Sequence, residues 1–307
     1  MEAKMTLSKA QEKMILGALV ADAASLGFHW LYDQPTIKRL ASSDPTFQSV
    51  SASEFENKGY FAHANKSTGE PSQYGAQLYA MLDSLKRKSG RFDLNDYALS
   101  FQEWFDFGGE WVGYIDKPTK LTLLAMHSAQ DSEAEISRCG ADDQQLPAVS
   151  KLPPLIAYIG DHKAHIEQAV RVTNNKDSAV QWALALATIM QAVLDGSSIR
   201  EAIALVRSNT TEEISTQIDG AINALNLSSE EYTQKTGLHC DLSAAFPVIL
   251  HILLTSSDYR SAVKTNIYCG GDSCGRAIII GAIMAVTDSS DIPAEWVAKT
   301  RFKRDQV

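Results

Sequence analysis

The 307-residue sequence lacks the features of several common classes of protein. It has no run of five or more basic residues, and its formal net charge is −9 with a pI near 5.3. Binding to nucleic-acid phosphates requires a basic face, so we expect no nucleic-acid partner. No apolar run reaches the roughly 18 residues that a membrane-spanning helix requires, so we expect no membrane partner either.

Cysteine is scarce, and its spacing does not suit a metal site or a disulfide framework. The four cysteines are Cys139, Cys240, Cys269 and Cys274, and no CxxC pair occurs. Structural zinc sites use closely spaced pairs of cysteine or histidine, so this sequence gives no support for such a site. We expect free thiols in a reducing, cytoplasmic environment.

The common catalytic fingerprints are also missing. No G-x-S-x-G, P-loop or dinucleotide-binding motif occurs. Of the seven histidines, only His162 and His165 share a predicted helix face, and no third metal ligand lies near them. His29 and Trp30 stand together in an aromatic segment that we interpret as packing. The function must therefore be inferred from less general features.

Helical periodicity is what the sequence has in abundance. Apolar residues make up 45% of the chain, which is ordinary for a soluble globular protein. They recur at three- and four-residue spacing, and no strand-length alternation joined by hairpin turns occurs. The pattern predicts helices over residues 7–26, 76–88, 93–105, 119–128, 151–159, 166–172, 178–194, 199–206, 212–225, 244–254, 259–267 and 273–286.

These helices predict an all-α fold that forms one compact domain over residues 1–307. The length suits one large domain with a generous core. Residues 40–72 are predicted to be a long loop because Ser, Asn, Pro and Gly are dense there. A second, acidic loop is predicted over residues 129–150.

The most informative segment runs from Cys269 to Arg276 and reads CGGDSCGR, followed by a long apolar helix. Two glycines followed by an acid and a serine are typical of a helix N-terminus. Unpaired amides and the positive end of the helix dipole face the preceding loop there. Asp272 and Ser273 are good N-cap residues, and either could instead ligate a hard cation.

Three further side chains are candidates for a site. Cys274 lies in the first helical turn, where the helix dipole and Arg276 would lower the pKa of a thiol. A reactive thiolate is one hypothesis, and a small buried packing residue, which we favour, is the other. Asp22 lies in an apolar, small-residue segment, so it either caps or pairs locally or belongs to a site. Arg276 would suit a phosphate-bearing ligand.

Three segments resemble the ADP-ribosylglycohydrolases. Residues 17–23, GALVADA, are similar to the opening motif G-A-x-x-G-D-A of that family, and residues 270–273, GGDS, resemble its closing motif G-G-D-T-D-T. Residues 152–155, LPPL, lie where the family has an apolar, proline-bearing segment. The resemblance spans nearly the whole chain. It implies a compact all-α fold with two magnesium ions that bind ADP-ribose and help to cleave an N- or O-glycosidic bond.

The sequence departs from that family at the implied metal ligands. The first acidic cluster of the family, T-D-D-T, corresponds here to residues 72–75, SQYG, in which both carboxylates are missing. In the closing motif Asp272 remains, but Cys274 replaces the second acid. Only Ser72 and Asp272 could still offer oxygen, and one acid cannot hold two Mg²⁺ ions. We therefore expect no cofactor, with Mg²⁺ expected only if the ancestral site is retained.

A sulfur residue in the closing motif is also a feature of one subgroup, the J-type lens crystallins of box jellyfish, to which selenoprotein J is related. The resemblance thus implies a non-enzymatic, lens-type protein. A net charge of −9 favours repulsion between copies at high concentration. Its partners would then be itself or other crystallins.

The alternative is an enzyme or a ligand-binding relative of one. It would bind an ADP-ribose-like ligand in the old cleft, or carry out thiol chemistry through Cys274. Asp22, Asp272 and Cys274 are the candidate catalytic residues under this hypothesis, and Arg276 is the candidate ligand-binding residue. Ser72 and Asp272 mark the vestigial metal position.

Overall fold

The chain folds as a series of α-helices joined by loops, which confirms the all-α prediction. A computed structural model describes residues 6–132, 135–287 and 291–302. Within these ranges the only β-type pairings are three isolated bridges. The α-helices are α1 (Lys9–Ser25), α2 (Gln34–Ala41), α3 (Gln73–Arg87), α4 (Leu94–Phe105), α5 (Lys117–Asp131), α6 (Leu152–Ile159), α7 (Lys163–Thr173), α8 (Asp177–Leu194), α9 (Ile199–Arg207), α10 (Glu212–Asn223), α11 (Ser229–Thr236), α12 (Leu242–Thr255), α13 (Tyr259–Cys269), α14 (Ser273–Met284) and α15 (Ala294–Lys299).

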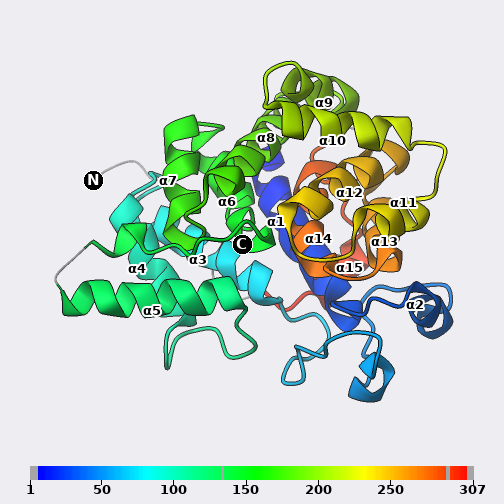
Figure 1. Ribbon diagram of the computed structural model, residues 1–307, viewed down its shortest axis with the longest axis horizontal. Helices are drawn as coiled ribbons and strands as arrows, with labels where there is room; N and C mark the ends of the chain where they lie inside the picture. The colour runs from blue at the N-terminus through cyan, green and yellow to red at the C-terminus, as the bar shows by residue number, and fades with distance from the viewer. Residues whose placement is uncertain (1–5, 133–134, 288–290, 303–307) are drawn as a thin grey trace.

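Two helices from opposite ends of the chain, α1 and α14, pack together at the centre of the molecule (Figure 1). They approach closely because Gly17 of α1 faces Gly281 of α14. A Cβ on Gly17 would lie 2.5 Å from the carbonyl oxygen of Gly281, and one on Gly281 would lie 2.3 Å from that of Gly17. The two glycines thus permit a contact that larger residues would prevent, and it brings Asp22 beside the start of α14.

The other helices surround this central pair. α3 packs against α4 and α6 on one side, and α11, α12 and α13 pack together on the other. The buried apolar residues form one continuous core. In the part of the chain that is described, α8 alone is long and apolar enough to cross a membrane. More than half of it is buried inside the protein, however, as is usual for the core helix of a soluble protein.

Every predicted helix is present, with ends that differ by a few residues. Three short helices, α2, α11 and α15, lie outside the predicted set. α2 and α11 carry few apolar residues, so their periodicity is weak, and polar caps define their starts. Asp33 accepts a hydrogen bond from the backbone N–H of Thr36 at the start of α2, and Ser228 forms a capping box with Glu231 at the start of α11.

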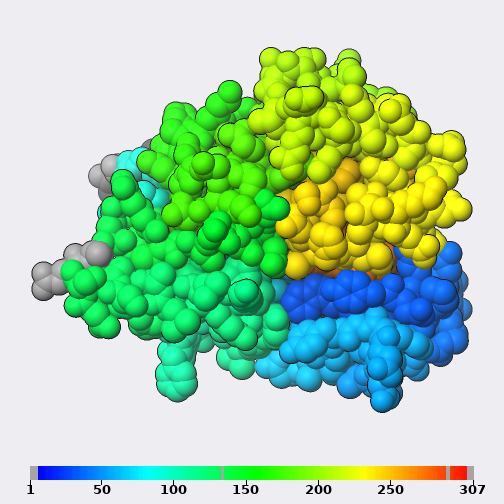
Figure 2. All heavy atoms as spheres, in the orientation of Figure 1, coloured from blue at the N-terminus to red at the C-terminus, as the bar shows by residue number. Residues whose placement is uncertain are grey.

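The predicted loop over residues 40–72 is present, and its one regular element is the 3₁₀ turn η2 (Ala52–Phe55). This loop lies at the lower right in the space-filling view, below the chain segments coloured yellow (Figure 2). It ends at Ser72, the N-cap of α3. The described residues share one hydrophobic core. The predicted domain limits, residues 1 and 307, lie outside the described ranges.

Candidate functional site

Four side chains from three helix segments meet in one buried cluster. Asp22 lies in the second half of α1, Ser72 and Tyr74 lie at the start of α3, and Asp272 caps α14. We call these four residues the acid cluster. Each of them is at most 1% exposed. The structure therefore brings together Asp22, Ser72 and Asp272, which the sequence analysis singled out separately.

Both carboxylate oxygens of Asp22 accept hydrogen bonds from Ser72. Oδ1 accepts one from the Ser72 hydroxyl at 2.5 Å, and Oδ2 accepts one from the Ser72 backbone N–H at 2.8 Å. Gly75 makes room for this carboxylate, because a Cβ on it would lie 2.4 Å from Oδ2. Burial raises the pKa of Asp22 to about 7, against the lowering effect of the bonds from Ser72.

Asp272 is held between the start of α14 and a tyrosine of α3. Its Oδ1 accepts a hydrogen bond from the Gly275 N–H at 3.0 Å, which caps the helix. Its Oδ2 accepts a hydrogen bond from the Tyr74 hydroxyl at 2.5 Å. Burial raises the pKa of Asp272, although the bond from Tyr74 and the charge of Arg276 act in the opposite direction.

The two glycines before Asp272 set the direction of its side chain. Gly270 and Gly271 have φ values of 74° and 65°, in the left-handed region that favours glycine. A Cβ on Gly271 would also lie 2.1 Å from the carbonyl oxygen of Leu238. The Gly271 N–H donates to the Leu31 carbonyl at 2.8 Å, and the Asp272 N–H donates to the Leu238 carbonyl at 3.1 Å. The loop is thus fixed by its backbone.

Arg276 braces the same loop from inside the protein. Its side chain is 1% exposed, and its guanidinium donates to the Asn266 Oδ1 at 2.9 Å and to the carbonyl oxygens of Asn266 and Gly270 at 3.3 and 2.6 Å. The hypothesis that Arg276 binds a phosphate-bearing ligand is at odds with this placement. Its Nε and Nη2 donate within the fold, and the side chain has almost no contact with solvent.

Cys274 is completely buried. Its thiol lies 3.6 Å from the carbonyl oxygen of Asp22. Burial raises the pKa of Cys274 well above its ordinary value, and the charges of Asp22 and Asp272 raise it further. This direction is opposite to the lowering expected from a helix N-terminus and Arg276, because desolvation and two neighbouring acids oppose the thiolate. The environment agrees with a packing role for this side chain.

A model of the ADP-ribosylglycohydrolase family matches residues 5–307 of the chain. The chain belongs to the ADP-ribosylglycohydrolase family. This confirms the resemblance inferred from the opening and closing motifs. The match covers nearly the whole sequence, so the acid cluster lies within the family's own architecture and is not an addition to it.

Two relatives of this chain carry crystallin names. Crystallin J1A of Tripedalia cystophora is 29% identical over 304 residues, which cover 93% of this chain and 90% of the relative. Crystallin J1B of the same organism is 26% identical over 311 residues, with 95% and 92% covered. A solved structure described as an ADP-ribosylglycohydrolase-related protein complex aligns with a TM-score of 0.68 over 96% of this chain and 94% of that one. Its identity of 14% shows a shared fold and nothing more.

Tyr74 is the member of the acid cluster that sequence reasoning missed. It lies in the segment 72–75, where the resemblance to the family implies two acids. Its ring is 1% exposed, and burial and the nearby Asp272 raise the pKa of its hydroxyl well above 10. A large aromatic residue at a position where an acid is implied was the signal that could have identified it.

Two buried histidines border the acid cluster. His29 follows the 3₁₀ turn η1 (Leu26–Phe28), and its Nδ1 accepts a hydrogen bond from the Cys274 N–H at 3.3 Å and lies 3.6 Å from the Asp272 Oδ1. Its ring stacks on that of His63, with centroids 5.2 Å apart. Burial lowers the pKa of His29 to about 3 and that of His63 well below 6.5. Both rings are therefore neutral near pH 7.

A buried acid and a buried lysine lie near the start of α5, and the sequence analysis identified neither. Asp116 caps α5, burial raises its pKa to about 6, and its Oδ2 has no hydrogen-bond partner among the described residues. Lys151 is fully buried, its Nζ donates to the Thr173 hydroxyl, and burial lowers its pKa well below 10.5. Neither position stands out by periodicity or motif.

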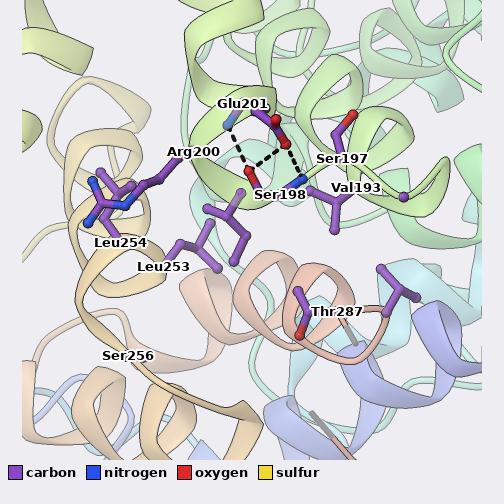
Figure 3. Close-up of a pocket in the computed structure, with 12 residues that line it drawn as sticks. Val193, Ser197, Ser198, Arg200, Glu201, Leu253, Leu254, Ser256 and Thr287 are labelled. Carbon is purple, nitrogen blue, oxygen red and sulfur yellow. Dashed lines mark hydrogen bonds between the residues drawn. The ribbon is translucent and has the colours of Figure 1, made fainter. Parts of the chain in front are cut away.

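A hollow in the surface lies at the opposite end of α14 from the acid cluster. It has a volume of about 510 Å³ and is lined by the ends of α8, α12 and α14 and the start of α9. Ser198 and Glu201 face each other there in a capping box (Figure 3). Leu253 and Leu254 contribute apolar surface. None of the residues that the sequence analysis proposed for a site lines this hollow.

Proposed function

We propose that this family member is a soluble, cytoplasmic, structural protein of the crystallin type, without glycohydrolase activity. The hydrogen bond between the Tyr74 hydroxyl and Asp272 carries the proposal. A phenol replaces one of the implied metal ligands and occupies an oxygen of the acid that remains. The residues of the acid cluster therefore do not fit a pair of magnesium ions.

The hydrogen bonds and the pKa values of the two carboxylates also support the loss of magnesium binding. Every oxygen of Asp22 and Asp272 accepts a hydrogen bond from the protein. Burial raises the pKa of both acids, which favours their neutral forms. Two Mg²⁺ ions require several ionised oxygen ligands, and Mg²⁺ gives up its water reluctantly. No group of three or more His, Cys, Asp or Glu residues in the described ranges is placed to hold a metal ion.

The relatives and the composition support the structural role. Crystallins J1A and J1B match along more than nine-tenths of this chain. The net charge of −9 suits a protein that remains dispersed at high concentration, with itself or other crystallins as neighbours. Two of the four cysteines, Cys269 and Cys274, are buried, which shields their thiols from oxidation.

Isothermal titration calorimetry with Mg²⁺ and with ADP-ribose tests the proposal. We expect no binding of either by the wild-type protein, and no release of ADP-ribose from modified substrates. The variant Tyr74→Asp with Cys274→Asp restores two acids beside Asp272 and should gain Mg²⁺ binding. Tyr74→Phe is the matched control, because it removes the hydroxyl without adding an acid. Micromolar Mg²⁺ binding by the wild-type protein would refute the proposal.

A second candidate function is the binding of an ADP-ribose-like ligand without turnover. Trp30, Tyr60 and Tyr114 form an aromatic group beside the acid cluster, with ring centroids 5.2 to 5.9 Å apart. Tyr60 is 54% exposed, so a flat ring could stack on it from solvent. ADP-ribose binding in the absence of Mg²⁺, weakened at least tenfold by Tyr60→Ala, would favour this candidate over the purely structural role.

A further inference from the structure

The space beside the two stacked histidines contains buried polar atoms without partners. Nε2 of His29 and both ring nitrogens of His63 make no hydrogen bond with any described residue. The residues are 2% and 7% exposed. A cavity of about 160 Å³ lies against both rings, and we call it the histidine chamber. Buried polar groups normally have partners, so this group requires an explanation.

The protonation of the rings makes the chamber a source of hydrogen-bond donors. Nδ1 of His29 accepts a hydrogen bond from the Cys274 N–H, so the proton of this neutral ring is on Nε2. His63 carries one further N–H. The hydroxyl-bearing residues Ser49, Ser67 and Thr68 also line the cavity. Donors for an external acceptor are therefore available from several directions.

Lys66 adds a positive charge to the same wall. Its side chain is 9% exposed, and its Nζ lies 4.0 Å above the ring of Trp111 and 3.9 Å from the Glu70 Oε1. No aspartate or glutamate is among the residues that line the cavity. Several N–H and O–H donors line the cavity and no carboxylate does, which suits an anion better than a cation, and the ammonium of Lys66 remains close although it is paired with Glu70.

The arrangement of the rings argues against a metal ion. The two imidazoles stack with their centroids 5.2 Å apart and their planes inclined by 29°, and among the described residues no third His, Cys, Asp or Glu joins them in a group that could hold a metal. A metal would need each nitrogen at about 2.0–2.1 Å. At about 30 Å³ per water, a cavity of this size holds about five waters, or one small oxyanion with some water.

We infer that the histidine chamber binds a small oxyanion of the phosphate or sulfate type, held by the imidazoles of His29 and His63 and the ammonium of Lys66. This site is separate from the acid cluster and does not depend on the proposed structural role. The shared chemistry is a tetrahedral oxyanion, which can be free in solution or part of a phosphorylated small molecule.

Thermal unfolding and calorimetry of the full chain with sodium sulfate and sodium phosphate test the inference. Sodium chloride at the same ionic strength is the control for screening. We expect 10 mM sulfate to raise the melting temperature by a few degrees more than chloride does, with a sub-millimolar dissociation constant for sulfate. Equal effects of sulfate, phosphate and chloride would overturn the inference.

Two variants locate the effect. His63→Phe retains an aromatic ring for stacking but removes both nitrogens, and Lys66→Met removes the charge. Each should weaken sulfate binding at least tenfold. Lys13→Met, which removes a lysine that is paired with Asp291, should leave sulfate binding unchanged. If His63→Phe does not fold, Lys66→Met alone decides. Unchanged sulfate binding in the folded variants would refute the site.

A third comparison identifies the source of the anion. Glycerol 3-phosphate carries the same oxyanion on a larger body. Binding tighter than that of inorganic phosphate supports the site and indicates a phosphorylated small molecule, whereas weaker binding supports it and indicates the free ion. Tight binding of Zn²⁺ without any response to sulfate or phosphate would overturn the inference. None of these outcomes depends on Mg²⁺ or ADP-ribose, so they are independent of the proposed function.

Discussion

The acid cluster and the histidine chamber are neighbours, and both are buried, yet they differ in how their polar atoms are paired. In the acid cluster every carboxylate oxygen accepts a hydrogen bond from a nearby side chain or backbone amide. In the chamber three imidazole nitrogens have no partner within the described chain. Burial of ionisable groups is thus common to both, and only the second retains polar atoms that a ligand could use.

The difference follows from the elements that build the two regions. The acid cluster is made by the starts of α3 and α14, where Ser72 and Asp272 use their side chains as helix caps. The chamber is lined by η1 and by the long loop over residues 48–68. The backbone of this loop supplies no hydrogen-bond partner for the nitrogens of His29 and His63 that face the chamber. At the start of a helix, polar side chains accept hydrogen bonds from the free backbone amides of the first turn. A loop has no such row of free amides, so it can leave space between its polar side chains.

The largest expected effect comes from removing the brace of the acid cluster. Arg276→Met deletes a buried guanidinium and leaves the carbonyl oxygens of Asn266 and Gly270 unpaired. We expect a loss of about 3–5 kcal/mol of unfolding free energy in urea titrations. Arg200→Met, at the rim of the hollow in Figure 3, should change stability by at most about 0.5 kcal/mol. Similar losses in the two variants would contradict the role of Arg276.

Asp22→Asn should change the pH dependence of stability. The folded-state pKa of Asp22, about 7, lies above its ordinary value of 3.8. The stabilisation by its protonated form is therefore complete below about pH 4 and is lost as the pH rises towards 7. Asparagine cannot ionise, so the stability of the variant relative to wild type should rise by about 2–3 kcal/mol between pH 5 and pH 8.

Denaturant titrations of both proteins across this range measure that difference. Asp116 and His29, whose pKa values are also shifted, occur in both proteins and cancel. A constant difference across the range would mean that Asp22 is ionised in the folded protein at all these pH values. The carboxylate would then be available to a cation, and the contrast with the histidine chamber would weaken.

A pair of glycine substitutions tests the close packing of the acid cluster. Gly75→Ala places a Cβ 2.4 Å from the Asp22 Oδ2 and should cost about 2 kcal/mol. Gly220→Ala is the matched control in α10, where the nearest atom to a new Cβ is the Tyr232 hydroxyl at 3.6 Å. That change should stabilise the protein by about 0.5–1 kcal/mol through helix propensity. Differential scanning calorimetry of both variants gives the comparison, and a loss of the same size in both would contradict it.

The smallest expected effect comes from a direct comparison of one variant in the acid cluster with one in the histidine chamber. Tyr74→Phe removes the donor to Asp272 and should cost about 1–2 kcal/mol. His63→Phe removes nitrogens that have no protein partner, so without added anion it should cost less than Tyr74→Phe or even stabilise the protein. Urea titrations in chloride buffer measure both. A larger loss for His63→Phe than for Tyr74→Phe would show that the chamber nitrogens are paired in solution.

The sequence predicted the helices well where apolar residues recur and poorly where they do not. The long helices α1, α8 and α14 carry many apolar positions, whereas α11 reads SEEYTQKT and depends on its cap. Within the candidate site, the motifs singled out Asp22, Ser72 and Asp272, which the structure places in one buried cluster, and their role stays a prediction. They did not identify Tyr74 or His63, because neither residue type implies a contact with a distant segment.

The helix-start argument shows where local reasoning stops. It offered a lowered pKa of the Cys274 thiol as one hypothesis, beside the favoured packing role, and it suggested Arg276 for a phosphate-bearing ligand, since both residues follow two glycines at the start of a helix. Both arguments assume that the helix start faces solvent. In the folded chain α1 and α3 cover that end of α14, and desolvation outweighs the dipole.

By itself, the sequence determined the all-α architecture and the family, because helical periodicity, helix caps and glycine-rich motifs are local properties that the chain carries wherever it folds. Only the tertiary structure decided which polar atoms are paired. The glycine contact joins α1 and α14, which lie more than 200 residues apart in the sequence, and the loop over residues 48–68 folds back onto η1. The resulting burial closes the acid cluster around its own hydrogen bonds and leaves three imidazole nitrogens facing a cavity.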